Sequence, residues 1–118
     1  MNIEELRTYC LSKKGATEDL PFDETTLVFK VMGKMFALTD LEDDLSVNLK
    51  CQPEQTIKLQ EEYEAVIPGY HMNKKHWITV IIDGSIPDKK IYEWIDESYR
   101  LVCGKLTKQQ KEDLQNMY

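Results

Sequence analysis

Apolar residues recur along the chain with two different periods, one typical of helices and one typical of strands. Near the start, Ile3, Leu6 and Cys10 lie on one helical face, and Asn2 and Glu5 have the spacing of a capping box. This pattern predicts a first helix from about residue 3 to residue 14, followed by an acidic loop.

Three further helices are predicted in the second half of the chain. One begins at Pro53 and reaches about Tyr63, because proline suits the first turn of a helix, where its missing N–H has no partner. A second is capped by Asp88 and runs to about residue 103. A third begins at Thr107, which forms a capping box with Gln110, and ends near residue 118.

Two segments, 27–32 and 35–41, have the composition of strands, and Gly33–Lys34 between them fits a two-residue hairpin turn. That turn would fix a register and so decide which side chains share a face. The predicted core face carries Leu27, Phe29, Val31, Phe36 and Leu38. The predicted opposite face carries Val28, Lys30, Met32, Met35, Ala37 and Thr39.

Two more strands extend this sheet. A tight turn at Glu42–Asp43 would pair Leu38 with Val47 and Phe36 with Leu49, and segment 76–82 places Ile78, Val80 and Ile82 inward. The order of elements predicts an α+β fold, a two-layer sandwich in which helices cover one face of an antiparallel sheet. Residues 1–118 are expected to form a single domain whose second sheet face is partly open.

Composition and charge narrow the function classes. Apolar residues make up 42% and charged residues 31% of the chain, as in globular proteins, and acidic residues outnumber basic ones from end to end, giving a net charge of −6. A dedicated DNA-binding protein normally carries a basic stripe. The five glycines are widely separated, which excludes glycine-rich nucleotide-binding loops.

No catalytic, metal or cofactor motif is found. The three cysteines are widely spaced and are expected to be reduced thiols in a soluble cytoplasmic protein, and no signal peptide or membrane span is expected. His71 and His76 do not have a known metal-ligand spacing. We therefore expect a protein that is not an enzyme and that needs neither a metal nor another cofactor.

The segment Tyr70–Trp77 concentrates lysine, amide and aromatic side chains within eight residues. Lysine neutralises phosphate and aromatic rings stack on bases, so this mixture is typical of nucleic-acid contacts. In the alternative interpretation, Trp77 covers apolar sheet surface and the lysines only keep a loop in solvent. The candidate contacts on this segment and on the open sheet face are Lys30, Lys34, Asn48, Lys50, Asn73, Lys74, Lys75, His76 and Trp77.

A family resemblance runs through several short motifs. They are Leu20-Pro21-Phe22-Asp23, Phe29-Lys30-Val31, Gly33-Lys34-Met35-Phe36-Ala37, Leu49-Lys50-Cys51, Pro53-Glu54, Pro68 to Ile78, and Ser98-Tyr99. With these motifs the chain resembles the MmcQ/YjbR family of small bacterial proteins, whose fold is similar to that of the bacterial frataxin CyaY. The resemblance implies an α+β sandwich and DNA binding. Iron binding is not carried over, because the first helix lacks a dense acidic ridge.

Together these observations predict a monomeric binding module with weak affinity for DNA. The competing hypothesis is a domain that binds a protein or a small anion through the same open sheet face. The two differ in their response to salt, because binding driven by phosphate weakens steeply as salt rises.

Overall fold

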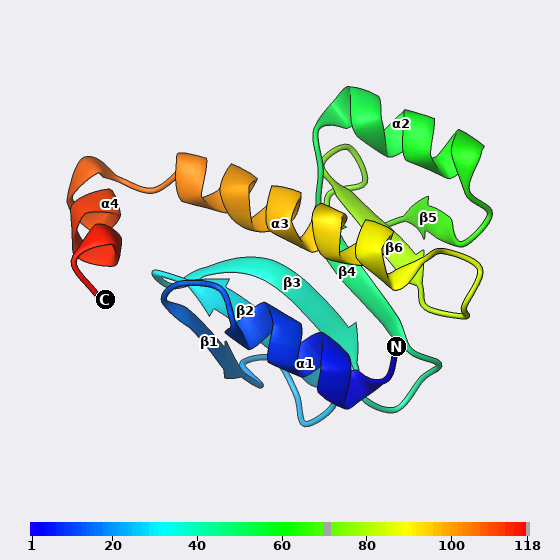
Figure 1. The fold of residues 1–118 in the computed structure, drawn as a ribbon, viewed down its shortest axis with the longest axis horizontal. Coiled ribbons are helices and arrows are strands. Elements are labelled where there is room, and N and C mark those ends of the chain that lie inside the picture. The colour runs from blue at the N-terminus through cyan, green and yellow to red at the C-terminus, as the bar shows by residue number, and fades with distance from the viewer. Residues whose placement is uncertain (70–71, 118) are drawn as a thin grey trace.

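The computed structural model describes residues 1–69 and 72–117, and these residues form four helices and a six-stranded antiparallel sheet (Figure 1). The helices are α1 (Ile3–Leu11), α2 (Pro53–Glu62), α3 (Asp88–Gly104) and α4 (Lys108–Gln115). The strands are β1 (Ala16–Asp19), β2 (Thr26–Val31), β3 (Lys34–Asp40), β4 (Ser46–Lys50), β5 (Val66–Pro68) and β6 (Trp77–Ile81). Their order across the sheet is β1-β2-β3-β4-β6-β5, so β1 and β5 form its edges.

The helices begin close to the predicted positions. The side chain of Asn2 accepts a hydrogen bond from the Glu5 amide at 2.8 Å, and the Glu5 carboxylate accepts one from the Asn2 amide at 3.1 Å. The same reciprocal pair forms between Thr107 and Gln110 at the start of α4. The cap of α3 is Pro87 rather than the expected aspartate. In the described part of the chain, no helix combines the length and apolar character that crossing a membrane requires.

The acidic loop predicted after the first helix is in part a strand. Helix α1 ends at Leu11, and Gly15 takes a left-handed φ of 71°, which turns the chain back into β1. Residues 16–19 then pair with β2, with Glu18 opposite Phe29. The sequence pattern predicts a loop here because the charged side chains hide the alternation expected of a strand.

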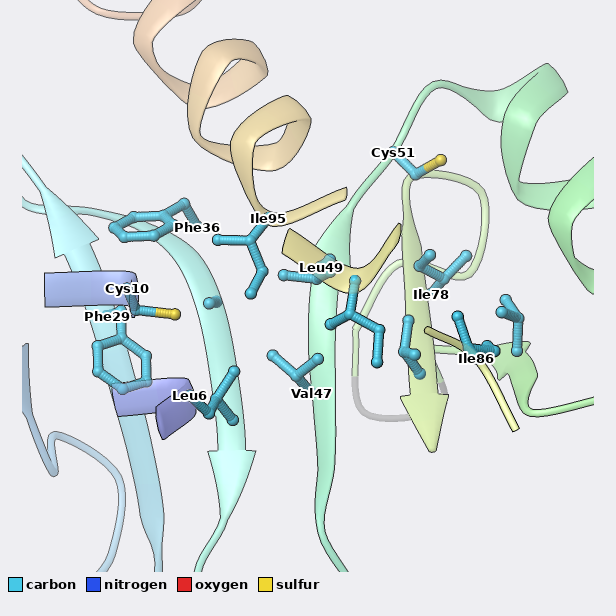
Figure 2. Close-up of a cluster of buried hydrophobic side chains, with 14 of the residues drawn as sticks. Leu6, Cys10, Phe29, Phe36, Val47, Leu49, Cys51, Ile78, Ile86 and Ile95 are labelled. Atoms are coloured by element: carbon cyan, nitrogen blue, oxygen red, sulfur yellow. The ribbon is translucent and has the colours of Figure 1, made fainter. Parts of the chain in front are cut away.

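The core lies between the sheet and the helices. It combines apolar side chains from α1, α2 and α3 with the inward residues of the strands, and Figure 2 shows Leu6 and Ile95 among the buried strand residues. Phe29 and Phe36 are fully buried, as predicted. The ring of Phe36 meets the ring of Tyr99 from α3 edge to face, with centroids 5.3 Å apart. These contacts confirm the two-layer arrangement.

The hairpin turn lies one residue earlier in the chain than predicted. Val31 pairs with Lys34, so the two-residue loop is Met32–Gly33. Both loop residues have left-handed φ values, 50° and 80°, as a type I′ turn requires. Glycine signalled the turn, but Met32 was not expected to adopt a conformation that side chains with a Cβ disfavour.

A β-bulge at Phe36 causes a second departure. Phe29 pairs with Ala37 and Lys30 pairs with Met35, so Phe36 is an extra residue in β3. Phe36 and Ala37, although consecutive, are both fully buried in the helix-side core.

The bulge turns the rest of β3 over relative to the prediction. Leu38 faces away from the helices, and the neighbouring pairs are Leu38 with Asn48 and Ala37 with Leu49 instead of the predicted pairs. Thr39, expected on the opposite face, is fully buried. We call the side of the sheet away from the helices the open face. Its central residues are Val28, Lys30, Leu38, Asn48, Lys50, Trp77 and Thr79.

Candidate functional site

A small apolar cluster occupies the middle of the open face. Val28, Leu38 and Trp77 are buried there, and Met35 and Met72 pack against them. Trp77 is only 8% exposed. An indole buried to this extent does not offer a face to a nucleic-acid base, so the structure corrects the predicted role of Trp77 as a stacking platform. Trp77 instead covers apolar sheet surface, which is the position that the alternative interpretation gives it.

The topology gathers most of the predicted lysines at one end of the open face. Lys30 and Lys50 stand near the C-terminal ends of β2 and β4, which run in the same direction because both are antiparallel to β3. Lys50 lies opposite Trp77, the first residue of β6. Residues 73–76 precede β6 and therefore lie at this end. We call it the lysine end.

Lys30 and Lys34 each have an identified partner within the protein. Lys30 forms an ion pair with Asp19 at 3.5 Å. Lys34 donates a hydrogen bond to the carbonyl of Lys105, just after α3, at 3.2 Å. Lys34 is thus held toward the helix layer, and the structure does not bring it together with the other candidates.

The segment before β6 is a tight turn. The Asn73 side chain accepts a hydrogen bond from the Lys75 amide at 2.8 Å. The main-chain carbonyl of Asn73 accepts hydrogen bonds from the amides of His76 and Trp77. The His76 carbonyl accepts from the Cys51 amide at 2.7 Å, which fastens the turn to the end of β4. Lys74 and Lys75 are exposed on it. Tyr70 and His71, which belong to the predicted segment, lie outside the described residues.

A hollow of about 440 Å³ lies toward the other end of the open face. Its walls come from the segment before β2, from β2, β3 and β4, and from Met72, which lies between β5 and β6 in the chain. The residues that line it are Phe22, Asp23, Thr25, Thr26, Leu38, Thr39, Asp40, Asn48 and Met72. Of the predicted contacts, Asn48 alone among the described residues belongs to it.

Hydrogen bonds fix the rim of this hollow. Asp23 accepts from the amides of Thr25 and Thr26 at 2.9 and 2.7 Å, and these bonds hold the pKa of its carboxyl below the usual value. Thr26 pairs with Asp40 across β2 and β3, and the Leu41 amide donates to the Thr25 carbonyl at 2.7 Å. Two carboxylates, Asp23 and Asp40, are therefore carried on the same rim.

Sequence reasoning missed the hollow, although it noted most of its parts. The sequence pattern predicts an acidic loop over segment 20–25. Asp23 followed at two and three residues by threonine is also the spacing of a turn in which the aspartate side chain accepts hydrogen bonds from the backbone. Leu38 was assigned to the core. The signal available in the sequence was an aromatic residue, Phe22, inside a polar loop, and the structure shows its side chain 65% exposed.

The thiols are not activated. Burial raises the pKa of Cys10 to about 12 and that of Cys51 to about 11. A catalytic cysteine requires the opposite shift, because the thiolate is the nucleophile. Among residues 1–69 and 72–117 no group of three or more His, Cys, Asp or Glu side chains is placed to hold a metal ion.

Comparisons with known proteins agree with the resemblance noted in the sequence. The YjbR family model matches residues 11–101. The protein YjbR of Escherichia coli (strain K12) is 37% identical over 112 residues, covering 94% of this chain and 95% of that protein. YyaQ of Bacillus subtilis (strain 168) is 35% identical over 113 residues, covering 83% of this chain and 95% of that protein.

Solved structures give the same fold. A crystal structure of the Deinococcus radiodurans protein DR2400 superposes with a TM-score of 0.89 at 41% identity, covering 96% of this chain and 87% of that one. A crystal structure of a Pseudomonas syringae protein superposes with a TM-score of 0.75 at 29% identity, covering 86% and 98%. Because the family model spans most of the sequence and the relatives match nearly end to end, this chain belongs to the YjbR family.

Proposed function

We propose that this protein is a non-enzymatic binding module that makes weak contacts with the nucleic-acid backbone through the lysine end of its open face. One observation carries the proposal. The sheet topology places Lys50, Lys30 and the turn that bears Lys75 together on the face that the helices leave uncovered. Lysines grouped in this way can neutralise neighbouring phosphates.

The proposed binding is weak for three reasons. Lys30 is already paired with Asp19, and Trp77 is covered by its neighbours, so neither adds a full contact. The net charge of −6 also opposes the approach of a polyanion. Contacts of this kind follow the backbone and carry no sequence preference.

The non-enzymatic part of the proposal is supported by the chemistry of the side chains. The pKa of each of the three thiols is raised, and burial is the main cause. His76 is the single histidine in the described part of the chain, and it sits in a turn whose backbone is fastened to β4. Buried thiols and a histidine held in a turn are not the activated nucleophile and base that catalysis by these residue types requires.

The test is a binding titration of duplex and single-stranded oligonucleotides at low salt. With about three phosphate contacts, the slope of log K against log salt on duplex DNA should be about −3. Replacing Lys50 and Lys75 together by glutamine should flatten that slope by about 2. The matched control is Lys58→Gln with Lys111→Gln, which removes the same charge from the exposed faces of α2 and α4.

Two outcomes would overturn the proposal. Oligonucleotides that do not associate with folded protein at low salt would exclude nucleic acid as the ligand. An equal loss of affinity in both double variants would show that binding depends on the overall charge of the protein and not on the lysine end.

A further inference from the structure

The hollow at the other end of the open face has the dimensions of a small-molecule site. Its volume of about 440 Å³ falls within the range of about 300–1,000 Å³ typical of ligand pockets. Leu38 lies at the sheet surface, and Met72 and Phe22 contribute walls from two separate loops. Apolar walls with a few polar groups at the rim are typical of sites for small organic ligands.

Phe22 stands out among the lining residues because it is 65% exposed. A large aromatic ring facing solvent at the mouth of a hollow is available to cover a ligand. An aromatic face also attracts a cation, because the ring carries negative charge above its plane.

The charges on the rim favour a ligand of positive charge. Asp23 and Asp40 both line the hollow, and the hydrogen bonds from Thr25 and Thr26 lower the pKa of the Asp23 carboxyl, which favours its charged form. The lysines of the open face lie at its other end. An anion would therefore meet two carboxylates, whereas a cation would be attracted by them.

One more polar group faces this space. The Oδ1 atom of Asn48 accepts a hydrogen bond from the Thr79 hydroxyl at 2.6 Å, which leaves the amide Nδ2 as the group that Asn48 can present to a ligand. The Asn48 amide, a hydrogen-bond donor near the two carboxylates, can orient a ligand without changing the preference of the hollow for positive charge.

We infer that this hollow binds a small organic cation, an amine with an apolar or aromatic body, whose charged group lies against Asp23 and Asp40 and whose body packs on Leu38, Met72 and Phe22. This site is separate from the lysine end, and it does not depend on nucleic-acid binding. Either proposal can fail while the other stands.

Three probes with the same phenyl body and different charge test the inference. They are phenethylammonium, 2-phenylethanol and 3-phenylpropionate, titrated into the full chain and followed by amide and methyl NMR shifts. Phenethylammonium should produce saturable shifts at Thr25, Thr26, Leu38 and Asn48. The alcohol should bind more weakly and the anion should leave these signals unchanged.

Variants separate charge from packing. Asp40→Asn retains an acceptor for the Glu42 amide and should weaken phenethylammonium binding by about fivefold, the upper value for a partly exposed ion pair. Asp44→Asn, a neighbouring exposed carboxylate that does not line the hollow, is the control. Phe22→Ala should also weaken binding, whereas Ile57→Ala, a residue of similar exposure at 62% on α2, should not.

The results that would overturn the inference are specific. Equal binding of the cation and the anion would show that the carboxylates do not select charge. Unchanged affinity in Asp40→Asn and Phe22→Ala, or shifts confined to residues away from the hollow, would place the cation elsewhere. Absence of saturable binding by phenethylammonium would also refute the inference, even if oligonucleotides bind at the lysine end.

Discussion

Ser98, a fully buried residue of α3, links the helix layer to the bulge in β3. Its hydroxyl donates to the Phe36 carbonyl at 2.6 Å and accepts from the Lys50 amide at 2.8 Å. The register between β3 and β4 ends at Ala37 with Leu49, so the next backbone pair would be Phe36 with Lys50. The serine oxygen therefore lies where a direct hydrogen bond between the strands would otherwise form.

Ser98→Ala removes this oxygen while changing the packed volume very little. The substitution eliminates two hydrogen bonds, so the Phe36 carbonyl and the Lys50 amide both lose the serine oxygen as a partner. The bond to the Phe36 carbonyl is fully buried. Loss of one hydrogen bond lowers the free energy of unfolding by about 1 kcal/mol, and a buried polar group left without a partner lowers it by about 1–3 kcal/mol. We expect the free energy of unfolding to fall by about 3 kcal/mol, a large fraction of the stability of a domain of this size.

Urea denaturation followed by circular dichroism measures this loss. The control is Ser12→Ala, because the Ser12 hydroxyl bonds the Tyr9 carbonyl at an exposed helix end, where the cost should stay below about 0.5 kcal/mol. Amide hydrogen exchange at Lys50 should also accelerate in Ser98→Ala. A loss below about 1 kcal/mol with unchanged exchange would mean that β3 and β4 close directly, and the bridging role would be refuted.

Two further predictions concern glycines and thiols. Gly33→Ala should lower the free energy of unfolding by about 1 kcal/mol through its left-handed φ alone, whereas Gly104→Ala at the end of α3 should raise it by up to about 1 kcal/mol, both measured by urea denaturation. In a thiol-disulfide dye assay at about pH 8, partly exposed Cys103 should react first. Cys10 and Cys51 should react only on unfolding, because both thiols are buried away from the reagent and burial raises their pKa to about 12 and about 11. Rapid reaction of Cys10 in folded protein would contradict this.

The sequence predicts the elements of this fold better than their register. Helix starts are local, so a capping pair such as Asn2 with Glu5 determines them within a few residues, and the structure confirms them. The bulge at Phe36 is not local. It depends on α3 supplying Ser98 to the bulged strand, a contact between residues 62 positions apart.

The same limit applies to the candidate site. Assigning Leu38 to the core followed correctly from simple alternation, and one inserted residue placed it on the open face instead. The position of the lysine end could be predicted, because it requires only the order and direction of strands. The hollow could not, since it depends on the turn at Asp23 and on Met72 reaching the same place from distant parts of the chain.

The two edges of the sheet bear on how the protein behaves at high concentration. An exposed strand edge can pair with the edge of another molecule and seed fibres. Here β1 has four residues and carries Glu18 and Asp19, while β5 has three residues and ends at Pro68, which has no backbone N–H to donate. The sheet can thus leave one broad face uncovered while both of its edges resist the strand-by-strand addition that leads to aggregation.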